Sequence, residues 1–221
     1  MSLMGSPVCW RNQVMNKAKS AERELSPEKT EAILDGAMQE FLEHGYAGAR
    51  IDKIVAAAGV SKATIYRRFA DKEALFTTLI QRMATRAELF QQQNFQSLQE
   101  EPVVFLKCYA AGMLDNISQD PQALTLLRII IGESGRFPEL ARTFVQTIEK
   151  PCLDFLTQYF AAHPKLQLAD PEVTARMFVG TLLHFVIVRD LLHGEDIVPM
   201  ECDRLTDSLV ALIVHKNVGN R

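Results

Sequence analysis

The sequence predicts an all-α protein made of a small N-terminal head and a larger helical body. Apolar residues recur at intervals of three and four through most of the 221 residues, which is the spacing of an amphipathic helix. Ser or Asp followed by Pro, a pair typical of a helix start, occurs at Ser26, Asp120 and Asp170. No stretch alternates with a period of two between turn residues, so the sequence predicts no strands.

Three segments are expected along the chain. Residues 1–25 read as a flexible polar tail, residues 26–72 as the head, and residues 73–221 as the body. The tail carries several basic side chains, so it would either stay unordered or contact DNA phosphates and a minor groove.

The first head helix begins at Ser26, which is placed to cap it, with Pro27 in its first turn. Gly45 is expected to end this helix, because glycine adopts the positive φ of a helix exit. The residues expected on its apolar face are Ile33, Leu34, Ala37, Met38, Phe41 and Leu42.

The stretch from Ile51 to Phe76 reads IDKIVAAAGVSKATIYRRFADKEALF and predicts two short helices joined by a turn at Gly59. Ser61 is expected to cap the second helix, and Asp71 a long third helix that connects the head to the body. Two helices joined by a short turn with a glycine are the helix-turn-helix unit, whose second helix enters the DNA major groove.

The second helix has two distinct faces. Ile65 and Phe69 fall together at 100° per residue and should point into the core of the head. Small, hydroxyl and guanidinium groups face outward, and these suit contacts with base edges and phosphates. The alternative is an ordinary solvated amphipathic helix. The residues predicted to bind DNA are Arg50, Lys62, Ala63, Thr64, Tyr66, Arg67 and Lys72.

The head resembles the DNA-binding head of the TetR/AcrR transcriptional regulators, most specifically through GVSKATIYRRF. Ala49 and Arg50 stand where the family usually has a Ser or Thr cap, and Ala63 stands in place of a common Gly. Such changes would alter which operator is read. The residues that carry the resemblance are Ile33, Ala37, Phe41, Gly45, Ile51, Ile54, Ala58, Gly59, Val60, Ser61, Thr64, Ile65, Tyr66, Phe69, Lys72, Leu75 and Phe76.

Charge and cysteine content fit a cytoplasmic protein that touches DNA at one end. The net charge is only −3, but residues 44–72 carry six basic and two acidic side chains, which leaves the rest of the chain acidic. The four cysteines form no CxxC pair, a pattern typical of a reducing compartment, and no metal site is expected. The longest uncharged run, 177–188, is too short to span a bilayer.

The body is expected to contain helices that begin near Pro102, Pro121, Pro138 and Pro171, with a kink or break at Pro151. The helix from Pro171 to about residue 192 is apolar nearly all round, and a further helix follows from about 200 to 216. One face of each helix would serve the core, and the remaining apolar surface predicts a homodimer through a four-helix bundle. The resemblance implies the same arrangement.

The resemblance also implies an effector pocket between the body helices. The aromatic and Met residues of this region would form its walls, and polar groups within apolar runs would orient a small, largely apolar ligand. Each residue alone could equally be ordinary core, and His184 could lie in a dimer interface. The residues predicted to bind the ligand are Phe105, Tyr109, Met113, Phe144, Phe178, Thr181 and His184.

No catalytic motif is present: the chain has no P-loop, GxGxxG, GxSxG or HExxH pattern, so neither an enzyme nor a cofactor is expected. A thiol sensor at Cys108 or Cys152 is the other alternative, since Lys107 and Lys150 lie near them in sequence. Together with the resemblance, the sequence predicts a one-component repressor that a small effector releases from a palindromic operator, with the GESGRFPELA segment resembling AefR-like relatives.

Overall fold

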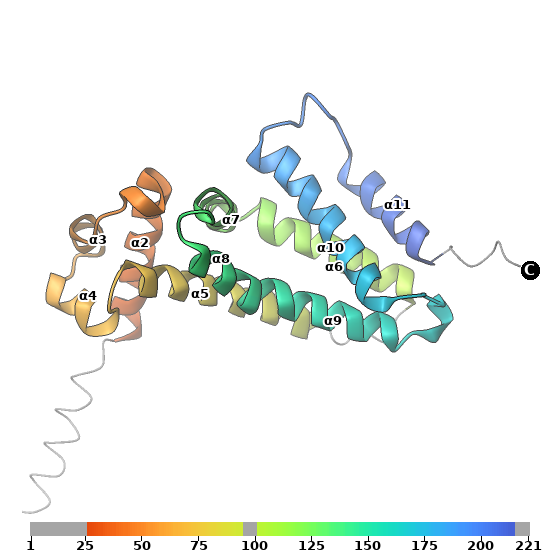
Figure 1. The fold of residues 1–221 in the computed structure, drawn as a ribbon, viewed down its shortest axis with the longest axis horizontal. Helices are drawn as coiled ribbons and strands as arrows, with labels where there is room; N and C mark the ends of the chain where they lie inside the picture. Colours follow the sequence, from red (N-terminus) through yellow and green to blue (C-terminus); the bar gives the residue numbers. More distant parts are fainter. Residues whose placement is uncertain (1–25, 95–100, 215–221) are drawn as a thin grey trace, which may run out of the picture. The chain divides into compact units, whose positions relative to one another are not determined.

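The structure is a computed structural model that describes residues 26–94 and 101–214, and every regular element in these ranges is a helix (Figure 1). The all-α prediction is confirmed. The chain divides into two compact units: a head, which runs to His44 and from Gly48 to Leu75, and a body, which comprises Gly45–Ala47 and the chain from Phe76. The predicted N-terminal tail, residues 1–25, lies outside the described residues.

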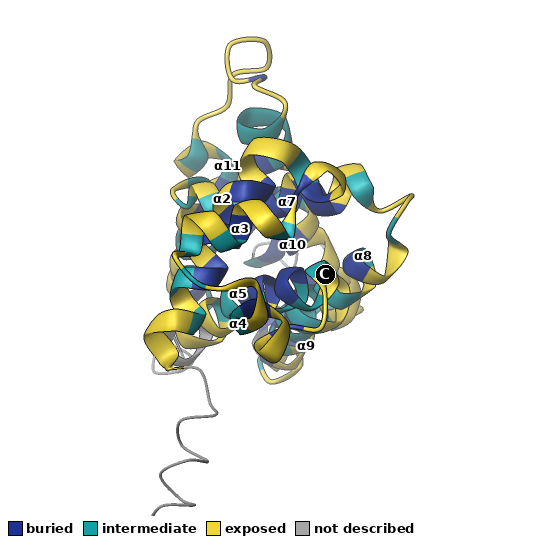
Figure 2. Cartoon of the chain, turned by 90° about the vertical axis from the view of Figure 1, so that its left-hand side faces the viewer, coloured by how far each residue is buried: buried dark blue, intermediate teal, exposed yellow. Residues whose placement is uncertain are grey.

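The head is built from α2 (Pro27–Gly48), α3 (Ile51–Ala58), α4 (Lys62–Arg68) and the first residues of α5 (Lys72–Asn94). Buried and exposed stripes follow one another around these helices, as amphipathic spacing requires (Figure 2). Most of the predicted apolar residues form one small core, which includes Ile33, Leu34, Ala37, Met38, Phe41, Ile54, Ile65, Phe69 and Leu75. The prediction was wrong for Leu42, which is 49% exposed.

Local interactions fix several helix ends where the sequence predicts them, but the first helix does not end at Gly45 as expected, because α2 continues to Gly48. Ser61 Oγ accepts the Thr64 N–H at 3.1 Å, and Asp71 Oδ1 accepts the Ala74 N–H at 2.8 Å. Gly59 ends α3 in the left-handed region at φ 63°, and Gly45 interrupts α2 at φ 66°. Only glycine adopts these φ values without strain.

The start of α3 lacks the usual side-chain cap. Arg50 occupies the cap position and makes no capping bond with its side chain. Its backbone N–H instead donates to Glu40 Oε1 of α2 at 3.0 Å. A carboxylate from the neighbouring helix therefore satisfies a backbone donor at the entrance to α3.

The body comprises the rest of α5 followed by α6 (Pro102–Ser118), α7 (Pro121–Glu133), α8 (Pro138–Phe144), α9 (Lys150–Ala161), α10 (Pro171–Val186) and α11 (Cys202–Val214). A proline lies in the first turn of α6, α7, α8 and α10, as predicted. Asp120 and Asp170 cap α7 and α10 through their carboxylates.

The body core lies where α6, α9 and α10 meet. Helix α10 packs against α9, and α6 contacts both α10 and α11. Phe105 stacks on Tyr159 with ring centroids 3.9 Å apart, and Phe178 is fully buried beside Tyr109. These aromatic contacts account for several of the large apolar residues of this region.

Two short π-helical turns interrupt the body helices, at Val145–Glu149 and Ile187–Leu191. The first lies directly before Pro151. Proline donates no N–H and its ring collides with the carbonyl four residues earlier, so the wider turn accommodates it. The sequence predicts a kink or division at Pro151, but the structure instead changes helix type there, and α8, the π-helical turn and α9 follow one another without a gap.

Helix α10 and the π-helical turn that follows it, Pro171–Leu191, are long and apolar enough to cross a membrane by length and composition. A core helix of a protein in water passes the same test. Six of the α10 side chains lie in the body core, namely Ala175, Phe178, Val179, Leu182, Phe185 and Val186.

Candidate functional site

The outward face of α4 is the first candidate site. Ile65 and Phe69 are buried in the head core, as the helical spacing predicts. Ala63, Tyr66 and Arg67 are exposed on the same short helix, and 49% of Tyr66 is open to solvent. This arrangement presents a methyl group, a phenol and a guanidinium to the outside of a helix-turn-helix unit.

Two basic side chains of this face, Arg67 and Lys62, differ in whether they pair with an acidic residue. In the described part of the chain, Arg67 makes no hydrogen bond or ion pair, so its guanidinium is available. Lys62 Nζ lies 2.7 Å from Asp52 Oδ1 of α3, and this hydrogen bond and charge lower the pKa of Asp52 and raise that of Lys62. Both groups are exposed, so the pair is weak and can be exchanged for a phosphate.

Two predicted contact residues also hold the head together. The Thr64 hydroxyl lies 2.8 Å from the Ser61 hydroxyl, at the start of α4. Lys72 Nζ donates to the Ala49 carbonyl at 3.2 Å, just beyond the end of α2. Lys72 therefore stabilises the head whether or not it contacts phosphate.

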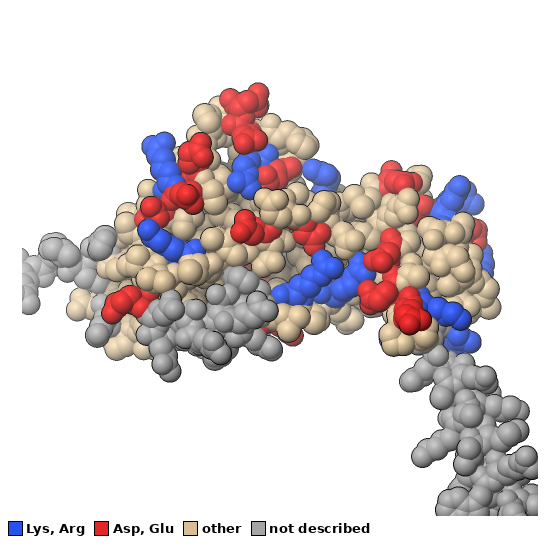
Figure 3. Space-filling view, turned by 180° about the vertical axis from the view of Figure 1, so that it is seen from behind, with Lys and Arg blue, Asp and Glu red and all other residues tan. Residues whose placement is uncertain are grey.

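Charges on the head are mixed. Figure 3 shows Lys and Arg side chains interspersed with Asp and Glu on the face that it presents, without an unbroken basic patch. Within the head, Lys62 faces Asp52 across the turn, which is one such alternation. Binding through this head would depend on a few well-placed groups more than on a broad basic surface.

The body contains the second candidate site, a cavity of about 320 Å³ between its helices. This is the lower end of the range for small-molecule pockets, about 300–1,000 Å³. Apolar side chains dominate the walls, and carboxylates and one arginine lie among them. The lining residues are Met83, Arg86, Ala87, Tyr109, Met113, Asp115, Asn116, Ile117, Gln119, Asp120, Ala123, Leu127, Phe144, Ile148, Glu149, Cys152, Val179 and Leu183.

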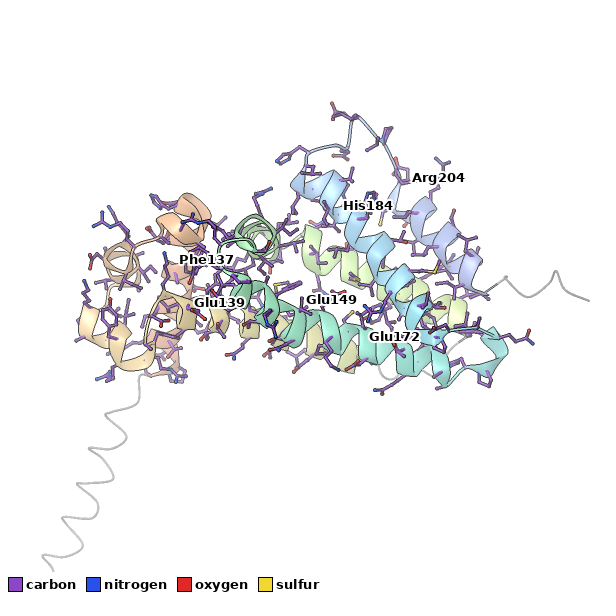
Figure 4. All side chains as sticks on the ribbon, in the orientation of Figure 1. Phe137, Glu139, Glu149, Glu172, His184 and Arg204 are labelled. Carbon is purple, nitrogen blue, oxygen red and sulfur yellow. The ribbon has the colours of Figure 1, made fainter. Side chains whose placement is uncertain are left out.

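The structure divides the seven predicted ligand residues among three places. Tyr109, Met113 and Phe144 line the cavity. Phe105 and Phe178 do not line it, because both are fully buried against other aromatic rings. Thr181 and His184 line a separate, smaller hollow of about 200 Å³ beside the α10–α11 segment, where His184 is exposed (Figure 4).

Sequence reasoning missed Glu149, the half-buried carboxylate of the cavity wall. It is the last residue of the π-helical turn (Figure 4). A π turn adds a residue to the helical repeat, so a pattern of three and four misplaces the side chains on either side of it. Pro151 was the one available signal, because it marks where the regular repeat fails.

The thiol-sensor alternative loses support at Cys152, whereas Cys108 is an exposed free thiol. Burial raises the pKa of Cys152 to about 11, and the Tyr109 hydroxyl lies 3.2 Å from its sulfur. A thiolate is the reactive form, so this thiol is unreactive at neutral pH. The lysines that adjoin the two cysteines in sequence are paired with carboxylates, Lys107 with Asp207 and Lys150 with Asp154.

Comparison with known proteins identifies the family. The profile of bacterial regulatory proteins of the tetR family matches residues 33–79. The profile of the AefR-like transcriptional repressor C-terminal domain matches residues 105–215. The two matches cover the helix-turn-helix unit and the helical body in turn.

Curated relatives match mainly through the head. The HTH-type transcriptional repressor AcnR of Corynebacterium efficiens is 44% identical over 54 residues, which are 24% of this chain and 29% of the relative. This chain thus aligns with less than a third of that relative's length. The uncharacterized HTH-type transcriptional regulator YvkB of Bacillus subtilis is 23% identical over 186 residues, 82% of this chain and 93% of the relative.

Solved structures share the whole fold. A tetR-family transcriptional regulator from Mesorhizobium loti superposes with a TM-score of 0.72 at 24% identity, over 87% of this chain and 98% of that one. AibR, solved with isovaleryl coenzyme A and operator DNA, superposes with a TM-score of 0.58 at 22% identity, over 84% of this chain and 98% of that one. From the two profile matches, the chain belongs to the tetR family of bacterial regulatory proteins with an AefR-like C-terminal domain.

Proposed function

We propose that this protein is a homodimeric repressor that binds a palindromic operator and leaves it when the body takes up a small, largely apolar effector. The observation that carries the proposal is α4, which buries Ile65 and Phe69 and turns Ala63, Tyr66 and Arg67 to solvent. Such a helix in a helix-turn-helix unit presents its outer side chains to base edges. A repressor of this kind acts on DNA in the cytoplasm.

Within the recognition face we assign base contacts to Ala63, Thr64 and Arg67, and phosphate contacts to Tyr66 and Lys72. Arg67 can form two hydrogen bonds to guanine, and the methyl groups of Ala63 and Thr64 suit thymine. Arg50 and Lys62 lie at the entrances of α3 and α4, where they can add phosphate contacts.

Homodimerisation is supported by apolar side chains that the monomer leaves exposed. Met177 of α10 is 59% exposed, and Leu212 of α11 is 69% exposed. Val173 adds to the exposed face of α10. Pairing of α10 and α11 with their copies would cover such groups in a two-fold symmetric four-helix bundle.

Effector binding is supported by the cavity in the body, whose walls include Tyr109, Met113 and Phe144. Helix α5 contributes Met83, Arg86 and Ala87 to the same cavity and is also the chain's path out of the head. A ligand that displaces α5 would change the separation of the two heads. In a dimer, both recognition helices must reach grooves about 34–36 Å apart, or a multiple of that.

Replacing Arg67 by Ala should weaken binding to the cognate operator by about 1–3 kcal/mol and relax specificity at one base pair. Replacing Lys72 by Gln should weaken binding to all DNA sequences alike. It should also reduce the slope of log affinity against log salt concentration by about one. Both effects can be measured by fluorescence anisotropy with the operator and with random DNA at several salt concentrations.

Arg204→Ala is the matched control, because Arg204 is an exposed arginine on α11 (Figure 4). It should leave operator binding unchanged. A thermal melt of the Lys72 variant must accompany the titration, since Lys72 also binds the Ala49 carbonyl. Equal losses for the Arg67 and Lys72 variants on both DNAs would contradict the assigned roles. Absence of binding by the native protein at low salt would contradict the function.

An effector that fills the cavity should reduce operator affinity roughly 5- to 150-fold, the usual range of coupling between two sites. Coupling is reciprocal, so the same ligand must bind the DNA complex more weakly by the same factor. Thermal-shift screening can find such a ligand. Calorimetry then measures its affinity for the free protein and for the operator complex. Identical ligand affinities in the two titrations would show that the cavity is not a switch.

A further inference from the structure

We infer that the body cavity takes an amphipathic cation, an apolar molecule with a protonated amine or quaternary ammonium group, and that the Glu149 carboxylate is its counter-charge. This inference rests on the proposed effector function of the cavity and adds the chemical class of the ligand. It is carried by the position of Glu149, by the absence of a partner for its carboxylate, and by the charges of the cavity wall.

Glu149 lies in the wall of the cavity and is half-buried. In the part of the chain that the structure describes, its carboxylate makes no hydrogen bond or ion pair. Ile148 and Cys152, its neighbours on the same helical rod, line the cavity with it. A carboxylate withdrawn from water without a partner is costly, so such groups are ordinarily paired.

The cations nearest to Glu149 in sequence or in space are engaged elsewhere. Lys150, the next residue, pairs with Asp154 one turn along α9. Arg176 attracts Glu149 only at longer range, and its guanidinium donates to Glu172 Oε1 at 2.8 and 3.1 Å. Within residues 26–94 and 101–214, this carboxylate is therefore left to be neutralised by a bound ligand.

The remaining charges of the cavity favour the same sign of ligand. Its lining holds three carboxylates, those of Asp115, Asp120 and Glu149, against a single basic side chain. That side chain, Arg86, already pairs with Asp120 at 2.8 Å. Asp115 is exposed and adds negative charge beside the cavity. An anionic ligand would find no free basic group among the lining residues, whereas a cation would find two free carboxylates.

The apolar part of the ligand has its own surface. Met113, Leu127, Ile148 and Val179 come from four different elements and surround the same space. Methionine side chains adapt to ligands of different outline, and an aromatic wall such as Phe144 can stack on a flat or cationic group. A long-chain or aromatic amine therefore matches both parts of the cavity, its apolar wall and the Glu149 carboxylate.

The electrostatics of the empty cavity agree with this assignment. Burial raises the pKa of Glu149 above its ordinary value, and the distant Arg176 only partly opposes the shift. A cation bound beside the carboxylate would stabilise its charged form and reverse the shift. Ligand binding would then relieve an unfavourable interaction already present in the folded protein.

The test compares three ligands with the same ten-carbon chain: decyltrimethylammonium, 1-decanol and decanoate, each below its micelle concentration. Calorimetry with the full-length protein should show the ammonium binding at least ten times more tightly than decanoate. In Glu149→Gln the affinity for the ammonium should fall about ten- to a hundredfold, as expected when a hydrogen bond or contact to a charged group is lost. Affinity for 1-decanol should stay unchanged, because that ligand uses only the apolar wall.

Glu139→Gln provides the control, since Glu139 is an exposed carboxylate on α8 outside the cavity (Figure 4). It should bind all three ligands as the native protein does. Tighter binding of decanoate than of the ammonium, or equal ammonium affinity in native protein and Glu149→Gln, would overturn the assignment of ligand class. If decanol or decanoate binds and weakens operator binding, the proposed function stands although the assignment of ligand class fails. If none of the three binds, the assignment of ligand class is overturned, and the operator titrations decide the proposed function separately.

A thermal melt without ligand gives an independent readout. Because the folded state raises the pKa of Glu149, its charged form destabilises the fold at neutral pH relative to low pH. Removing that charge should leave Glu149→Gln at least as stable as the native protein at pH 7. A clearly lower melting temperature for Glu149→Gln than for the native protein would show that Glu149 has a structural partner. That result would contradict its role as the counter-charge of a bound ligand.

Discussion

Replacing Met177 and Leu212 together by Asp is expected to convert the protein into a monomer. Both side chains lie largely in solvent in the isolated chain, on α10 and α11 respectively. In the proposed bundle they would be covered, and an uncompensated charge in such a place costs about 3–5 kcal/mol. Since each substitution occurs twice in a two-fold dimer, dimer affinity should fall at least about a hundredfold. Sedimentation at micromolar concentration measures this directly.

The native protein should sediment at twice 24.8 kDa and the double variant at 24.8 kDa, with unchanged helical circular dichroism. Val104→Asp is the control, because Val104 is an exposed apolar residue on α6 and should leave the dimer intact. Operator binding should be lost with the dimer, since one head alone contacts one half-site. A native protein that sediments only as a monomer would refute the proposed bundle.

Replacing Phe69 by Ala is expected to unfold the head while the body stays folded. Phe69 is buried in the small head core and closes α4, its N–H donating to the Ile65 carbonyl at 2.8 Å. Loss of a buried Phe costs about 3–5 kcal/mol. A unit of this size has little stability to lose. DNA binding should disappear for every sequence, whereas ligand binding to the body should persist.

Tyr66→Ala separates folding from contact in this experiment. Tyr66 lies on the exposed flank of the same helix, so its removal should change stability by no more than about 0.5 kcal/mol. It should still weaken DNA binding if it contacts phosphate. Calorimetric melting should show an early transition for the head in the Phe69 variant alone. A single unchanged melt for that variant would mean that the head core does not depend on Phe69.

The sequence by itself determined the helices and their ends. Three helices are capped by a side chain that accepts the N–H three positions along, namely those of Ser61, Asp71 and Asp170. Gly59 ends α3 with a positive φ. These interactions are local, so they can be read along the chain. The split of α4 into a buried and an exposed face follows in the same way, because helical geometry fixes it before any other element is present.

Departures from the family pattern were visible in the sequence, but their structural consequence was not. The sequence shows Arg50 as an unusual residue at the start of α3, but it does not show that the Arg50 N–H donates to Glu40, which belongs to another helix. Lys72 was read only as a phosphate contact, and its bond to the Ala49 carbonyl depends on how the end of α2 approaches α5. Both contacts join elements that only the folded head brings together.

Tertiary structure alone decided which body residues surround a cavity. In the sequence, Phe105 and Phe178 look the same as Tyr109 and Phe144, because all four are large aromatic residues in apolar helices. The packing of α6, α9 and α10 buries Phe105 and Phe178 in the core, whereas Tyr109 and Phe144 line the cavity. Glu149 reaches the wall on a π-helical turn that a regular repeat cannot anticipate. Local hydrogen bonds and helical periodicity are encoded by near neighbours, whereas a cavity is set by how distant helices fit against one another.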